Sequence, residues 1–263
     1  MTKETSGDTE KRMLAVLLKA ADGETLRQWT ETYAAENPSF CRATIAQLQE
    51  RCMPKEDTSE AWQEKIEEIF SAECVHYRHR YSFEGTDWEK IGEDMENLFD
   101  FLSLMDVKEA VSPIHAAVSA FFRQVEAEYN DYFLENAYAC VVDAGEKGKE
   151  LLLNVLRSDE VPQERKREIL KDMDDIRQLS MYCYEDYFGM EGFSSLLSLV
   201  LLPEAEAVSR LDEMIAKEPA WAAYPYIMEK ERLLRKLGRT EEAEQLVAQH
   251  GDILSTPKMR VKC

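Results

Sequence analysis

The chain has 263 residues, of which 44% are hydrophobic and 32% are charged. This length and apolar fraction are enough to bury a substantial core, in one elongated domain or in two compact ones. A formal net charge of −20 would repel the phosphates of a nucleic acid, so we expect no direct nucleic-acid binding unless a local basic patch exists. Only 10 glycines and 8 prolines, together with many Glu, Leu, Ala and Lys residues, favour helices over a turn-rich β architecture.

The cysteine pattern and the apolar runs indicate the compartment. The six cysteines are scattered without a Cys-x-x-Cys pair, and the N-terminal residues lack the apolar stretch of a secretory signal. The longest apolar run, Leu196–Leu202, is far shorter than the roughly 20 residues that cross a bilayer. We therefore expect reduced thiols, no membrane span and a cytoplasmic location.

Three segments are expected along the chain. Residues 1–9 are predicted to be a disordered N-terminus, residues 10–250 an α-helical repeat domain, and residues 251–263 a short basic tail. A sub-boundary can fall near residues 81–86, where a Phe-Glu-Gly sequence ends one helical segment. A first helical hairpin is expected over residues 26–48.

Capping signals predict three helix starts in the middle of the chain. Either residue of the pair Thr58-Ser59 can cap a helix that extends through Glu73. A capping box that begins at Thr86 starts the second helix. The third can start at Asp106, or at the cap and proline pair Ser112-Pro113.

The second half of the chain contains two prolines that open helices and one irregular stretch. Pro162 and Pro203 each open a helix, while Gly145 and Gly148 would permit a bend in the helix before Pro162. Residues 181–193, which hold several aromatic residues and two glycines, are expected to be the least regular part of the chain.

Near the C-terminus, the sequence predicts a pair of helices joined by a short turn. Tyr226, Leu233 and Leu237 form one apolar stripe at helical spacing. Gly238 lies just beyond that stripe, where a helix often ends in a left-handed residue, and Thr240 can cap the next helix. An αα-hairpin is therefore expected.

The turn of this hairpin carries a family resemblance. Leu237-Gly238, followed by Glu241, Glu242 and Ala243, resembles the turn of a tetratricopeptide repeat. The resemblance implies an all-α fold of about ten to twelve helices, stacked as antiparallel hairpins in a tetratricopeptide-like superhelix. The segment Leu26–Leu48 also resembles the helical region that accompanies SWIM zinc fingers in bacterial proteins.

One short segment concentrates metal-ligand residue types. Cys74, His76 and His79 lie within six residues, but on a helix the first two would be about 200° apart. No Cys-x-Cys pair precedes them, so the SWIM zinc motif is absent, and a di-iron site would need a second Glu-x-x-His. We predict no bound metal or cofactor, and we keep a metal-dependent or thiol-based enzyme or sensor centred on these residues as an alternative.

Other catalytic patterns are weak. The glycines at 145 and 148 lack the spacing and the hydroxyl residue of a phosphate loop, and no Gly-x-Ser-x-Gly sequence occurs. Cys41, Cys140 and Cys183 are interpreted as small core residues rather than nucleophiles. The sequence therefore favours a protein that is not an enzyme.

A set of tyrosine and acidic residues is the remaining candidate site. Tyrosine provides rigid apolar area with a polar tip, and neighbouring carboxylates can bind Lys or Arg of a peptide. The predicted partner-binding residues are Tyr129, Asp131, Tyr132, Tyr184, Glu185 and Tyr187. We predict a protein–protein interaction module or scaffold whose partner is a basic peptide or protein, with an acidic nucleic-acid mimic that inhibits a basic protein as a further alternative.

Overall fold

The computed structural model describes residues 23–40, 44, 53–54, 56, 58–71, 73–78, 81–129, 137–219 and 222–251. By its internal contacts, the chain divides into a unit of residues 1–55 and a unit of residues 56–263. The domain expected over residues 10–250 is thus divided between residues 55 and 56, whereas residues 81–86 form a strand.

The described part of the N-terminal unit contains α2 (Gly23–Glu36), and residues 38–40 and 44 are also helical. The rings of Trp29 and Tyr33 stack on this helix with their centroids 5.6 Å apart, and both side chains are largely exposed. Most of the second helix expected before residue 48 lies outside the described residues.

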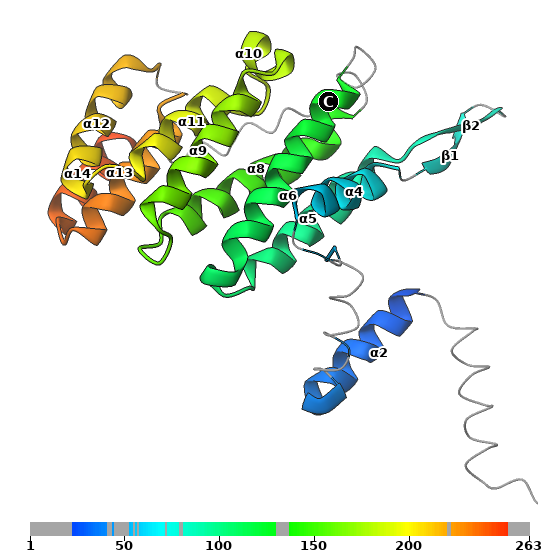
Figure 1. Ribbon diagram of the computed structural model, residues 1–263. Helices are drawn as coiled ribbons and strands as arrows, with labels where there is room; N and C mark the ends of the chain where they lie inside the picture. Colours follow the sequence, from blue (N-terminus) through cyan, green and yellow to red (C-terminus); the bar gives the residue numbers. More distant parts are fainter. Residues whose placement is uncertain are drawn as a thin grey trace, which may run out of the picture. The chain divides into compact units, whose positions relative to one another are not determined.

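The C-terminal unit is helical in its described part, apart from one β-hairpin (Figure 1). The expected all-α class is therefore confirmed. The longer helices are α4 (Ser59–Phe70), α5 (Trp88–Ser103), α6 (Val107–Glu128), α8 (Tyr138–Leu156), α9 (Gln163–Arg177), α11 (Met190–Leu199), α12 (Glu204–Lys217), α13 (Tyr224–Lys236) and α14 (Thr240–Gln249). Two short elements, α10 (Ser180–Glu185) and the 3₁₀ turn η1 (Tyr187–Gly189), connect α9 to α11.

The β-hairpin lies between α4 and α5 in the chain. Strands β1 (Glu73–Arg78) and β2 (Tyr81–Thr86) are antiparallel, with Glu73 opposite Thr86. The prediction that the α4 helix extends through Glu73 is wrong, because this helix ends at Phe70. The residues that follow alternate aromatic or β-branched types with polar ones, a pattern that favours strands.

Among the described helices, α4, α5 and α6 begin just after a residue whose side chain caps the helix. The Thr58 hydroxyl accepts a hydrogen bond from the Ala61 amide at 3.2 Å, which confirms that cap. Asp106 caps α6, so the helix does not begin at Pro113, which lies inside it. The capping box at Thr86 is wrong, because the Asp87 carboxylate caps α5 instead. A carboxylate oxygen can accept the hydrogen bond of a backbone amide at a helix start, just as a hydroxyl oxygen can.

The core forms where α5 and α6 each pack along α8, while α4 packs along α6. Phe121 on α6 lies at its centre, fully buried, and its ring contacts four other rings edge to face. The ring partners of Phe121 are Phe70, Phe99, Phe122 and Phe188, with centroids 5.1 to 6.2 Å away. Helix α9 continues the stack by packing on α6 and α11, and α12, α13 and α14 pack in sequence order.

Three glycines permit close approach between these helices. A Cβ atom at Gly92 on α5 would lie well inside van der Waals contact of the Cys140 carbonyl oxygen on α8. Added Cβ atoms at Gly145 and Gly148 would lie 2.5 Å from the Phe188 ring and 2.9 Å from the Phe99 ring. The bend expected at these two glycines is wrong, because α8 runs without a break through both. They provide space for aromatic rings.

The C-terminal hairpin has the expected turn. Gly238 adopts a φ of 73°, which confirms the left-handed residue after α13, and the small Ala243 is fully buried on α14. Thr240 is not the cap that we expected, because it is the first helical residue and Arg239 precedes it without a side-chain cap bond. The Arg239 guanidinium instead pairs with Glu242.

We expect Gly92→Ala to lower the free energy of unfolding by about 2 kcal/mol or more, because a backbone carbonyl cannot move away as a flexible side chain would. Urea denaturation followed by circular dichroism measures this. Helix propensity alone would raise the free energy of unfolding, because it favours Ala over Gly by about 1 kcal/mol. Gly251→Ala, at a position with open space around it, is the control. A Gly92→Ala protein as stable as the wild type would contradict the close approach.

Candidate functional site

The structure brings together two of the predicted partner-binding tyrosines. Tyr129 follows the end of α6 and Tyr187 lies in η1, and their ring centroids are 6.1 Å apart. Tyr138, the first residue of α8, joins them with its ring centroid 5.2 Å from that of Tyr187. All three side chains are half-buried. The sequence set did not include Tyr138.

The other members of the predicted set are not placed. Asp131 and Tyr132 lie outside the described residues. Tyr184 and Glu185 lie in α10, but the structure does not describe their side chains. The predicted site therefore rests on Tyr129 and Tyr187.

A strained turn positions Tyr187. Residues Asp186, Phe188 and Gly189 have φ values of 45°, 62° and 58°, in the left-handed region. Non-glycine residues occupy that region at a cost of about 1 kcal/mol or more each. We expected residues 181–193 to be the least regular part of the chain. Among the described residues, the non-glycine residues with positive φ both lie in this stretch, which agrees with that expectation.

Several contacts hold the turn in place. The Phe188 side chain is buried among aromatic rings, including that of Tyr138 at 5.1 Å. The buried Lys149 on α8 donates a hydrogen bond from Nζ to the Phe188 carbonyl and forms an ion pair with Glu146 at 2.7 Å. Asp186 Oδ1 accepts a hydrogen bond from the Glu191 amide at 2.9 Å. These contacts offset the backbone strain. They hold the turn so that the Phe188 ring is buried while the neighbouring Tyr187 ring is half-buried.

Two further residues of the region have structural roles. The Glu126 carboxylate accepts hydrogen bonds from the Ser180 hydroxyl at 2.6 Å and from the amides of Ser180 and Met181, so it binds the first turn of α10. The buried Tyr182 hydroxyl donates to the Phe122 carbonyl at 2.6 Å. Burial raises the pKa of Tyr182 well above its ordinary value, with Glu126 adding to the effect.

Two carboxylates act through space on Tyr138. Burial raises the pKa of Tyr138, and the negative charges of Glu146 and Asp186 raise it further. Both Asp186 and Glu191 are exposed. We call the set formed by Tyr129, Tyr138, Asp186, Tyr187 and Glu191 the acidic tyrosine patch. Protonated phenols can donate hydrogen bonds there, and carboxylates can pair with a cation.

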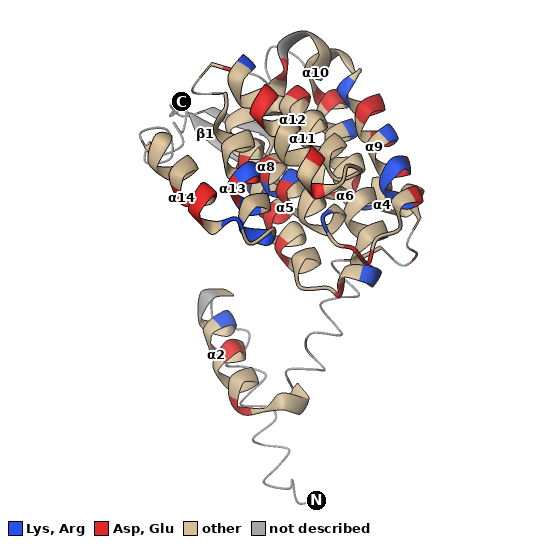
Figure 2. Ribbon diagram, turned by 90° about the vertical axis from the view of Figure 1, so that its left-hand side faces the viewer, with Lys and Arg blue, Asp and Glu red and all other residues tan. Residues whose placement is uncertain are grey.

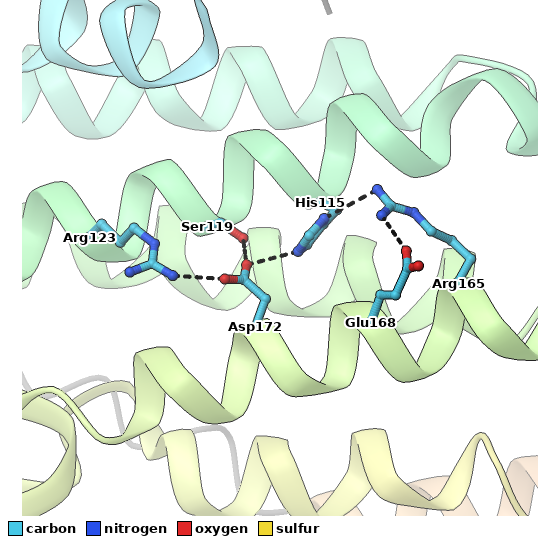
Figure 3. A network of polar contacts seen from close by, with 6 residues as sticks. All are labelled: His115, Ser119, Arg123, Arg165, Glu168 and Asp172. Atoms are coloured by element: carbon cyan, nitrogen blue, oxygen red, sulfur yellow. Dashed lines mark hydrogen bonds and ion pairs between the residues drawn. The ribbon is translucent and has the colours of Figure 1, made fainter. Parts of the chain in front are cut away.

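A second polar cluster joins α6 to α9 (Figure 3). Asp172 on α9 accepts hydrogen bonds at Oδ2 from the Ser119 hydroxyl at 2.6 Å and from His115 Nε2 at 2.8 Å. Arg123 Nη2 donates to Oδ1 at 2.7 Å. Arg165 Nη2 lies 3.4 Å from His115 Nδ1. One carboxylate thus binds three side chains of the neighbouring helix.

This cluster contains the residue types of a Ser-His-Asp triad in a different arrangement. In a triad the serine donates to the histidine, which can then remove its proton. Here Ser119 donates to Asp172 instead, so His115 does not activate it. Since Arg165 can only donate, His115 accepts at Nδ1 and carries its proton on Nε2, as assigned from the donors around it. We therefore interpret the cluster as a connection between helices.

The environment strongly favours the ionised form of Asp172. Hydrogen bonds from His115, then from Ser119 and Arg123, hold the pKa of this carboxyl well below its usual range, against the opposing effect of burial. Sequence reasoning missed the cluster. Its only signal was the spacing of four between His115, Ser119 and Arg123, which places them on one helix face.

The candidate metal ligands of the alternative lie in or beside β1. Cys74 and His76 belong to β1, so the helical argument that placed them about 200° apart does not apply, and residues two apart in a strand share a face. Their side chains are not described, and His79 lies outside the described residues. Within the described part of the chain, no group of three or more His, Cys, Asp or Glu residues is arranged to hold a metal ion.

The cysteines differ from expectation in one case. Cys183 is exposed, so its interpretation as a core residue is wrong: α10 directs this position to the surface. Cys140 is half-buried where α8 meets α5, and Cys41 lies outside the described residues.

Comparison with protein-family models, with curated proteins and with solved structures gave no match. None of the described helices combines the length and the apolar character needed to span a membrane.

We expect Asp172→Asn to lower the free energy of unfolding by about 2 kcal/mol at neutral pH, because three donors lose a charged acceptor. The folded-state pKa of Asp172 lies below its unfolded value of about 3.9. Its ionised form therefore stabilises the fold above that pH, and the contribution is lost as the pH falls through the folded-state pKa. The difference between wild type and variant should shrink below about pH 4, as measured by urea denaturation across pH.

Asp174→Asn on the same helix is the matched control, since Asp174 is exposed and pairs only with Arg177 three residues away in the described structure. We expect a change within about 0.5 kcal/mol for this variant. Equal effects of the two substitutions would show that the Asp172 cluster does not connect the helices.

Proposed function

We propose that the chain is a non-enzymatic interaction module, built from stacked helical hairpins, that binds a basic peptide or protein segment at the acidic tyrosine patch. The packing of α12, α13 and α14 in sequence order through short connections supports the resemblance to tetratricopeptide arrays. Such arrays present binding surfaces without further chemistry.

The observation that carries this proposal is the meeting of Tyr129, Tyr138 and Tyr187 beside Asp186. Residues from α6, α8 and η1 converge there, although they are up to about sixty positions apart in the chain. Tyrosine rings provide contact area at low entropic cost, and the carboxylates provide partners for Lys or Arg. Aromatic anchors with charged neighbours are typical of binding surfaces.

The charge of the chain supports the same partner. Acidic and basic residues are interspersed along the helices of the C-terminal unit in Figure 2, and the whole sequence carries a net charge of −20. A basic partner would be attracted over a distance comparable to the screening length, roughly 10 Å at 0.1 M salt. The alternative of a nucleic-acid mimic is supported by this charge alone. Binding of a basic segment is supported by the charge and by a specific location, the acidic tyrosine patch.

We expect Glu191→Lys and Tyr187→Ala each to weaken binding of the best peptide from a library of short Lys- and Arg-rich peptides by about tenfold, measured by fluorescence anisotropy. The first variant places a repelling charge in the patch, and the second removes a ring that contacts both other tyrosines. Binding should also weaken as salt is raised.

Glu109→Lys is the matched control, because it makes the same change in net charge at the opposite end of α6, about 30 Å from Tyr129. We expect this variant to bind the peptide nearly as well as the wild type. An equal loss with Glu109→Lys and Glu191→Lys would contradict the patch and favour attraction by net charge.

A further inference from the structure

A polar cavity of about 110 Å³ lies at the other end of α8 from the acidic tyrosine patch. Tyr138 begins this helix and Arg157 caps its end, so the two places are about 28 Å apart along the helix axis. The cavity is lined by residues of the α8–α9 and α11–α12 connections, of the start of α9, of the end of α11, of the start of α12 and of α13. Its basic lining residues are Arg157, Lys166, Arg232 and Lys236.

Three of the four cations already have carboxylate partners. Glu229, which is buried, accepts hydrogen bonds from Arg157 and from Arg232, the latter at 2.7 and 3.1 Å. Lys236 pairs with Glu204 at 2.5 Å. These pairs neutralise both of the lining carboxylates that lie within the helices.

Lys166 is different. Only 4% of this residue is exposed, and the described residues supply neither a hydrogen bond nor an ion pair to its ammonium group. The third lining carboxylate, Asp159, acts on it only through space, and the side chain of Asp159 is 94% exposed. Lys166 lines the cavity, so a polar group or an anion that enters the cavity could bind its ammonium group.

A second donor beside the cavity, on Arg157, also lacks a hydrogen-bond partner in the described structure. The Arg157 Nε atom is buried and has no hydrogen-bond partner in the described structure, although both terminal nitrogens of this guanidinium are bonded. Burial lowers the pKa of Lys166, and the charge of Lys236 lowers it further while Asp159 opposes them. An anion beside the amine would reverse this shift.

The helix ends around the cavity do not decide the sign of the ligand. Helices α9 and α12 begin there, each after a proline without a side-chain cap bond, and their first-turn amides favour an anion. Helices α8, α11 and α13 end there, and their carbonyl groups act in the opposite sense. The side chains decide, since four cations face three carboxylates.

We propose that this cavity binds a phosphate group, with Lys166 as its cationic anchor and Arg157 as a second donor. A water molecule occupies about 30 Å³ of liquid, so the cavity has room for a group of phosphate size and not for a nucleoside enclosed with it. Lysine and arginine are the side chains that most often bind phosphate oxygens. The site is independent of the interaction function proposed above.

Isothermal titration of the full chain with inorganic phosphate, against chloride at matched ionic strength, tests the proposal. We expect saturable phosphate binding to the wild type and at least about a tenfold weaker association for Lys166→Met, which loses a charged donor. Lys171→Met is the matched control, because Lys171 is an exposed lysine on the same helix, and it should bind phosphate as the wild type does.

The melting temperature provides a second measurement. Without phosphate, Lys166→Met should melt at the same temperature as the wild type or higher, because the change removes an unpaired buried charge. Phosphate should raise the melting temperature of the wild type and not that of the variant. Should Lys166→Met fail to fold, the wild-type titration alone decides.

A peptide carrying phosphoserine, added in a separate titration, distinguishes free phosphate from a phosphate group on a larger molecule. Binding of the phosphopeptide with the same dependence on Lys166 supports the second source, and binding of inorganic phosphate only supports the first. Absence of saturable binding to the wild type, or equal binding by Lys166→Met, overturns the site.

Discussion

The close packing of α8 against α5 and α6 is the constraint on which the other features depend. Gly92 lets the backbones of α5 and α8 approach, and Gly145 and Gly148 leave room on α8 for the rings of Phe188 and Phe99. Burial of these rings and of the aliphatic side chains around them stabilises the packing, because apolar area removed from water is the main favourable term in folding. The same helix carries Tyr138 at its start and Arg157 at its end. One buried element therefore positions both the acidic tyrosine patch and the proposed phosphate cavity.

Part of the large negative charge joins helices to one another. Asp172 binds three side chains of α6, Glu126 binds the first turn of α10, and Glu229 binds two arginines from α8 and α13. Each of these carboxylates is satisfied by several donors, although it is partly or fully buried. The acidic residues available to a partner are consequently those on the exposed helix faces and in loops, such as Asp186 and Glu191.

The turn at residues 186–189 links the core to the proposed binding surface. Phe188 points into the aromatic core while its neighbour Tyr187 lies half-buried beside Tyr129 and Tyr138. Left-handed backbone at Asp186 and Phe188 makes this division between adjacent side chains possible, and the Lys149 hydrogen bond to the Phe188 carbonyl secures it. Strained backbone is retained where the surrounding contacts determine it fully, and such places are often functional.

The helical class, the helix starts at Pro162 and Pro203 and the left-handed Gly238 followed from the sequence alone, because caps and turns depend on residues within a few positions of one another. The sequence left two alternatives for each of the starts at Thr58 and Asp106, and the structure decided between them. The choice between Thr86 and Asp87 as a cap, and the strands after Phe70, also required the structure. Only tertiary packing decided that Tyr138 joins Tyr129 and Tyr187, that Asp172 meets α6, and that Lys166 is buried without a carboxylate. These contacts join residues that are distant in the chain, and they depend on which helix faces meet, which periodicity alone does not specify.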